Sequence, residues 1–162
     1  MTASVQKSEQ SAPQSVTNAI QKLLQETYTV FLATHNYHWN VEGMQFVSLH
    51  TLFEQQYTEL FAAIDVIAER LRALETYALP EGYAAIFSRL KEVATPGKTS
   101  SGESAAKAMI QHLIGLNECC VQAAQTLKTV ATAAGDDESV DLGVERTQVH
   151  QKALWMLRSL LK

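Results

Sequence analysis

The chain has 162 residues, of which 46% are hydrophobic and 19% are charged, with a formal net charge of −4. This length suits one domain, because a chain of this size buries roughly 70% of the surface that it exposes when unfolded. The acidic balance gives no broad attraction for phosphate backbones, which argues against nucleic-acid binding as the main function.

The first residues differ in character from the rest of the chain. Residues 1–14 are expected to form a mobile tail, and residues 15–162 a folded domain. The tail contains Lys7 and Glu9 but neither an apolar run nor a series of arginines, so we expect no signal or transit peptide. No run of about eighteen apolar residues occurs. These features predict a cytoplasmic protein without a membrane span.

Four long helical patterns follow, with few interruptions, since the chain has only 7 Gly and 3 Pro. Apolar side chains recur at helical steps over 15–41 and again over about 47–78. A short helix is expected over 84–94, a third long helix over about 100–134, and a fourth after residues 133–139. With one long connection between the second and third long helices, this order predicts an all-α, ferritin-like four-helix bundle with a short helix in that connection.

The two cysteines, Cys119 and Cys120, are adjacent within a helical pattern. Neighbouring side chains on a helix point about 100° apart, so a disulfide between them is not expected. No CxxC or Cys/His spacing of a zinc site occurs. We expect two reduced cysteines without a special role.

Ionisable side chains cluster around the first predicted turn. His38 and His50 lie on either side of Gly43, close to the end of the first helix and the start of the second. An antiparallel hairpin would bring the two imidazoles together. On a helical wheel, a stripe beside the apolar face of the second helix contains the second histidine and three carboxylates, namely His50, Glu54, Asp65 and Glu69.

This stripe is too long for one metal ion. His50 and Asp65 are about 22 Å apart along a helix axis. If two copies of the helix lie antiparallel about a two-fold axis near Glu59, His50 and Glu54 of one copy face Asp65 and Glu69 of the other. Mixed nitrogen and oxygen donors suit iron, manganese or zinc. We therefore expect a homo-oligomer with a metal site shared between subunits, and spacing alone does not choose the metal.

Each of these residues also has an ordinary explanation. His38 and His50 would then be interface histidines, and Asp65 and Glu69 a solvated helix face. The convergence of several donors under one symmetry operation favours the shared site over this alternative.

The sequence "YHWNVEG" at 37–43, followed by His50 and by "DVIAER" at 65–70, resembles the signature of the Dps family of mini-ferritins. In that family, dodecameric shells oxidise iron at sites between two-fold related subunits, commonly with hydrogen peroxide. The shell stores the ferric product in its cavity. The resemblance implies a ferroxidase that oxidises Fe(II) with hydrogen peroxide or oxygen, stores iron and protects against oxidative damage.

The resemblance also assigns the ligands of the iron. They would be His38, His50 and Glu54 of one subunit, with Asp65 and Glu69 of its partner; the two histidines, Asp65 and Glu69 would be the catalytic set. Glu54 stands where many members have Asp, and its extra methylene makes its ligand role the least certain of the five. The Glu-x-x-His pairs of larger ferritins do not occur in this sequence.

Two further side chains lie near His38. Trp39 is expected to pack beside the site and to intercept an oxidising equivalent, with a buried interface aromatic as the alternative. His35 is one helical turn away and is expected to support the site, with plain packing as the alternative.

The acidic segment "GDDESVD" opens the fourth predicted helix. In Dps-like shells the equivalent segment lines three-fold pores, so Asp137, Glu138 and Asp141 would attract ferrous ions inward. The alternative is the usual preference of acidic side chains for a helix N-terminus. Some members compact DNA through lysine-rich tails, and this is the alternative function. Here the tail has only Lys7, so DNA binding is not expected to be strong.

Overall fold

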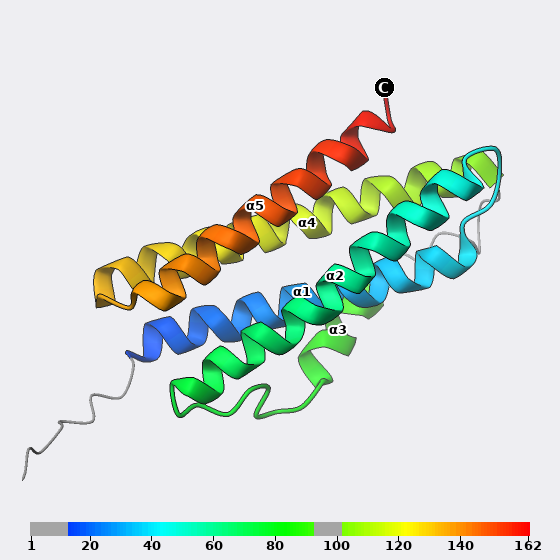
Figure 1. The fold of residues 1–162 in the computed structure, drawn as a ribbon. Coiled ribbons are helices and arrows are strands. Elements are labelled where there is room, and N and C mark those ends of the chain that lie inside the picture. Colours follow the sequence, from blue (N-terminus) through cyan, green and yellow to red (C-terminus); the bar gives the residue numbers. More distant parts are fainter. Residues whose placement is uncertain (1–12, 93–101) are drawn as a thin grey trace, which may run out of the picture.

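The computed structural model describes residues 13–92 and 102–162. The helices in these residues are α1 (Gln14–Asn40), α2 (Phe46–Ala73), α3 (Ala84–Glu92), α4 (Gly102–Ala134) and α5 (Asp137–Ser159). Figure 1 shows the four long helices packed along one another, with short α3 in the connection between α2 and α4. This arrangement confirms the predicted all-α four-helix bundle.

The described part of the chain begins at Pro13. Of the tail predicted over residues 1–14, residues 1–12 lie outside the described part, and α1 begins directly after Pro13. Within the described residues, no helix has both the length and the apolar character that a membrane crossing requires.

Helix α2 ends at Ala73, so the prediction of a helix to about residue 78 is wrong. Glu75 has a positive φ of 59°, a left-handed conformation that terminates a helix. The backbone N–H of Thr76 then donates to the carbonyl of Leu71 at 2.9 Å. This is the hydrogen-bond pattern of a Schellman cap, usually formed around glycine, and the apolar periodicity does not reveal it.

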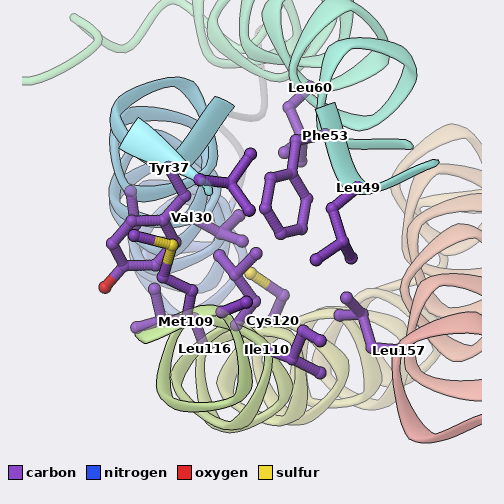
Figure 2. Close-up of a cluster of buried hydrophobic side chains, with 14 residues drawn as sticks. Val30, Tyr37, Leu49, Phe53, Leu60, Met109, Ile110, Leu116, Cys120 and Leu157 are labelled. Atoms are coloured by element: carbon purple, nitrogen blue, oxygen red, sulfur yellow. The ribbon is translucent and has the colours of Figure 1, made fainter. Parts of the chain in front are cut away.

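The core consists of two clusters of buried apolar side chains. The first, drawn in Figure 2, lies at the end of the bundle where α1 turns into α2, and it joins α1, α2, α4 and the end of α5. The second fills the opposite end, between α1, α2, α4 and the start of α5. The largest fully buried members of the first cluster are Tyr37, Leu49, Phe53, Met109, Ile110 and Leu113.

A largely buried polar network joins the half-buried Glu59 in the middle of α2 to α5. Arg146 is 2% exposed, and its guanidinium donates to both carboxylate oxygens of Glu59, at 2.5 and 3.1 Å. His150, 1% exposed, has its Nδ1 2.8 Å from the side-chain oxygen of Asn117. Burial, and next the nearby Arg146, lower the pKa of His150 to about 3. The network therefore holds a neutral imidazole and a paired guanidinium inside the bundle.

Candidate metal centre

The turn between α1 and α2 places the two predicted histidines opposite each other. α1 ends at Asn40 and α2 begins at Phe46. Gly43 has a φ of 103°, which a side chain would strain. Its carbonyl accepts the N–H of Phe46 at 3.0 Å. This tight reversal makes α1 and α2 antiparallel, so His38 near the end of one helix meets His50 near the start of the other.

His38 and His50 hold each other by reciprocal hydrogen bonds. Nδ1 of His38 is 2.9 Å from the backbone oxygen of His50, and Nδ1 of His50 is 2.8 Å from the backbone oxygen of His38. The rings are stacked, with centroids 3.8 Å apart and planes 20° apart. A carbonyl oxygen only accepts, so each Nδ1 carries the hydrogen, and in the neutral ring the lone pair lies on Nε2. The pair thus presents two Nε2 donors of the kind that bind metals.

Aromatic neighbours restrict both imidazoles. The ring of Phe46 lies 5.0 Å from that of His50, and Tyr57 meets His38 edge to face at 5.1 Å. His38 is only 8% exposed, while His50 is half-buried. The side chains are therefore oriented by their own chain before any ion binds.

The three predicted carboxylates are placed differently. Glu54, Asp65 and Glu69 are all exposed on α2. In the part of the chain that the structure describes, none of them has a hydrogen-bond or ion-pair partner. Glu54 lies one turn beyond His50. Asp65 and Glu69 belong to the far half of the same helix, about 22 Å or more from His50 along the axis.

The structure therefore brings His38 and His50 together and leaves Asp65 and Glu69 apart from them. Across residues 13–92 and 102–162 of one chain, no three histidine, cysteine or acidic side chains converge as a metal site would require. A site that used all five predicted donors would need those donors from two copies of α2.

Trp39 and His35 continue the ring contacts beyond the pair. The centroids of His35 and Trp39 are 4.1 Å apart, and those of His35 and Tyr57 are 4.5 Å apart. Partial burial, and next the neighbouring His38, lower the pKa of His35. Trp39 is 63% exposed within one chain, so it is not a buried core residue.

The predicted pore residues lie in the first turns of α5. Asp137, Glu138 and Asp141 are exposed, and Glu138 approaches Nη2 of Arg70 at 3.9 Å. Two of them, Glu138 and Asp141, line one open hollow between α2 and α5 together with Glu69. The hollow thus joins two acidic groups that the sequence suggested separately.

Sequence reasoning missed the residues that fix this end of the bundle. The side chain of Asp136 accepts the N–H of Ser139 at 3.0 Å and so caps α5. It also accepts from Nη2 of Arg70 at 2.5 Å, and Nε of Arg70 donates to the Ser139 hydroxyl at 3.0 Å. An aspartate just before a helix is a recognisable cap signal. The contribution of Arg70, 66 residues away from Asp136, has no local signal.

Comparison with known proteins agrees with this architecture. The family model of the ferritin-like domain matches residues 17–162. DNA protection during starvation protein 2 of Bacillus anthracis is 31% identical over 148 residues, which cover 90% of this chain and 96% of the relative.

Solved structures point to the same family. The Dps of Thermosynechococcus elongatus is 30% identical, with a TM-score of 0.75 over 91% of this chain and 90% of that one. The Dps of Vibrio cholerae O1 is 27% identical, with a TM-score of 0.75 over 92% and 90%. It is described as a member of a broad superfamily of ferritin-like diiron-carboxylate proteins. The chain belongs to the Dps family within the ferritin-like superfamily.

Proposed function

We propose that the protein is a ferroxidase and iron-storage mini-ferritin. It oxidises Fe(II) with hydrogen peroxide at sites shared between two-fold related subunits, and it stores the ferric mineral in a dodecameric shell. Removing ferrous iron and peroxide together protects against oxidative damage. The observation that carries the proposal is the reciprocal pairing of His38 and His50, in which Nδ1 of each stacked ring meets a backbone oxygen and Nε2 is the nitrogen left to bind a metal.

The proposed coordination sphere combines two chains. His38, His50 and Glu54 of one subunit would bind the ferrous substrate together with Asp65 and Glu69 of a second copy. Imidazole nitrogen suits Fe(II), and the harder carboxylate oxygens stabilise Fe(III) more than Fe(II), which favours oxidation. The exposure of the three carboxylates within one chain leaves them available to such a partner.

The protein contributes to this oxidation mainly by positioning the iron ligands. Two Fe(II) ions each give one electron to hydrogen peroxide, the O–O bond breaks, and two protons are taken up to form two waters. The ferric ions then hydrolyse to mineral. The chain's part is to hold the imidazoles in one tautomer and orientation while leaving an open position for the oxidant.

Exposed apolar side chains near the histidines and farther along α2 support the two-fold assembly. Large apolar side chains that are exposed in the single chain gather at the end of α1, in the turn and along α2. Exposed apolar groups that adjoin one another commonly mark an interface. They are Trp39, Met44, Phe46, Val47, Phe61 and Val66.

The proposal is tested by adding Fe(II) without oxygen, then hydrogen peroxide, and following ferric absorbance by stopped flow. The parent should react fast, and His38→Ala and Asp65→Asn should each be slower by more than about 100-fold, since even indirect supports of a metal ligand cost 10–100-fold. Glu81→Gln removes an exposed carboxylate from a loop and serves as the charge control. Parent-like rates in both site variants would overturn the assignment. Equal rates with oxygen and with peroxide would overturn the choice of oxidant.

DNA binding is the second candidate, because the Bacillus anthracis relative is named for DNA protection. The net charge of −4 does not favour it. Retention of DNA in a gel at low salt that disappears as salt is raised would show that this chain shares that property.

A further inference from the structure

Tyr37 and His112 form a partly buried pair between α1 and α4. Tyr37 lies on α1 directly before His38, and its hydroxyl is 2.6 Å from Nδ1 of His112 on α4. The two rings meet edge to face with centroids 5.7 Å apart. Figure 2 shows the tyrosine ring at the edge of the first core cluster, with its hydroxyl oxygen pointing away from the other side chains. Tyr37 itself is 2% exposed.

The hydrogen in this pair belongs to the phenol. A tyrosine hydroxyl carries its proton at neutral pH. Burial lowers the pKa of His112, which favours a neutral imidazole. The hydroxyl therefore donates to a lone pair on Nδ1, and a base stands ready at hydrogen-bond distance from the phenolic proton.

Such an arrangement makes a tyrosine easier to oxidise. A phenol that loses an electron becomes a strong acid, so its oxidation is favoured when an acceptor for the proton is already in place. Trp39, the residue that the sequence suggested for this role, is 63% exposed. Among the aromatic side chains of the described residues, Tyr37 is the one whose hydroxyl meets an imidazole.

We propose that Tyr37 is a redox-active residue that gives one electron to the iron site when peroxide meets a single Fe(II) ion, and that His112 accepts the phenolic proton. This inference rests on the proposed ferroxidase function. Tyr37 and His38 are adjacent, with Cα atoms about 3.8 Å apart, so the electron donor and an iron ligand lie on the same turn of α1.

One Fe(II) gives one electron to peroxide, the O–O bond breaks, and Fe(III), hydroxide and a hydroxyl radical result. The radical takes one electron from Tyr37 and one proton from water and becomes water, with a second hydroxide left behind. The phenolic proton moves to Nδ1 of His112, which yields a neutral tyrosyl radical and an imidazolium. The hydroxyl radical is thereby removed inside the protein.

The first test needs no iron. Iron-free protein is oxidised by light with a ruthenium polypyridyl complex and persulfate, frozen, and examined by electron paramagnetic resonance. The parent and the matched control Tyr77→Phe, which removes an exposed hydroxyl, should give the same tyrosyl signal. Tyr37→Phe keeps the ring but should lose that signal. His112→Gln keeps a hydrogen-bond acceptor without a strong base, and the signal should form more slowly. A full signal in Tyr37→Phe, or a tryptophanyl radical in its place in the parent, would overturn the proposal.

A second measurement separates this inference from the proposed function. Fe(II) below the number of sites is mixed with excess peroxide in the presence of a spin trap. Tyr37→Phe and His112→Gln should release more trapped hydroxyl radical than the parent, whereas Tyr77→Phe should not. Equal release from all four proteins would contradict the inference. If the parent fails to oxidise iron at all, the proposed function fails instead, and the light-driven result still decides whether Tyr37 is redox-active.

Discussion

The two halves of α2 hold the proposed iron donors in opposite ways. At the first half, His50 and its partner His38 are stacked and bonded to each other's backbone. At the second half, Asp65 and Glu69 are exposed. Imidazoles that bond to backbone carbonyls can be held inside one chain at little cost, whereas a carboxylate taken from water needs a compensating partner. The comparison suggests that each chain prepares the histidine half alone and completes the carboxylate half only with a second copy and an ion.

In the middle of α2, one carboxylate does have a partner within its own chain. Glu59 is bound through both oxygens by Arg146 of α5, in contrast to Glu54 one and a half turns earlier. Carboxylates on one helix thus divide into one that anchors the fold and others that are free for ligation.

The largest expected effect is the loss of iron oxidation when a ligand is removed from either half of α2, and only the histidine half should also lose stability. His50→Ala and Asp65→Asn should each slow iron oxidation by more than about 100-fold. Only His50→Ala should also lower the free energy of unfolding, by about 1 kcal/mol, because it removes the hydrogen bond to His38 and the ring contact. Stopped-flow rates and urea unfolding at one protein concentration measure the two effects. Equal destabilisation by both substitutions would show that Asp65 is already engaged within its own chain.

Breaking the anchor in the middle of α2 should cost stability. Glu59→Gln leaves the guanidinium of Arg146 buried without its counter-charge; because the Glu59 side chain is itself 40% exposed, the free energy of unfolding should fall by about 2 kcal/mol. The matched variant Glu54→Gln removes an exposed carboxylate from the same helix and should change it by less than about 0.5 kcal/mol. Urea unfolding of both variants measures the two losses in the free energy of unfolding. Similar losses would remove the distinction between anchoring and free carboxylates.

The buried imidazole beside this anchor should make stability depend on pH. The pKa of His150 is lowered from 6.5 to about 3, so below pH 6.5 the unfolded chain binds a proton that the folded chain does not. The contribution of His150 to the free energy of unfolding is complete above its pKa in the unfolded chain. This contribution is lost as pH falls toward its pKa in the folded chain, by at most about 1.4 kcal/mol per pH unit. Urea unfolding of the parent and of His150→Gln between these limits should show a shallower slope in the variant. Parallel slopes would mean that His150 is protonated in the folded protein.

The smallest effect concerns Glu54, the ligand with the least support. Glu54→Asp shortens an exposed side chain by one methylene, and should change the rate of iron oxidation by no more than about tenfold. Titration with Fe(II) under nitrogen, followed by peroxide, measures binding and rate together. A complete loss of oxidation would show that the longer side chain is required, and that Glu54 is a principal ligand.

The sequence was informative where structure is local. Helical periodicity and Gly43 predicted the α1–α2 hairpin, and with it the meeting of His38 and His50, because both depend on short-range geometry. The pairing of each Nδ1 with the opposite carbonyl depends on the register of two packed helices, which no spacing reveals. The same holds for Glu59 and Arg146, which are 87 residues apart.

The end of α2 and the contacts of Asp136 were not predicted from the sequence, for different reasons. The early end of α2 depends on Glu75 in a left-handed conformation, where a sequence pattern would look for glycine. Asp136 could have been identified as a helix cap from its position before α5, whereas its contact with Arg70 could not. The convergence of Asp65 and Glu69 on the histidines of another chain stays a prediction, since it depends on assembly.

Mixed assemblies test the shared site most directly. Shells made only of His38→Ala chains or only of Asp65→Asn chains should be inactive. The two kinds of shell are dissociated, mixed in equal amounts and reassembled. Random pairing makes half of the two-fold pairs mixed, and each mixed pair has one complete site of two, so about a quarter of the parent activity should return. Recovery near a quarter supports donors from two chains. No recovery from properly reassembled shells would mean that His38 and Asp65 serve the same site within one chain, and would contradict the account.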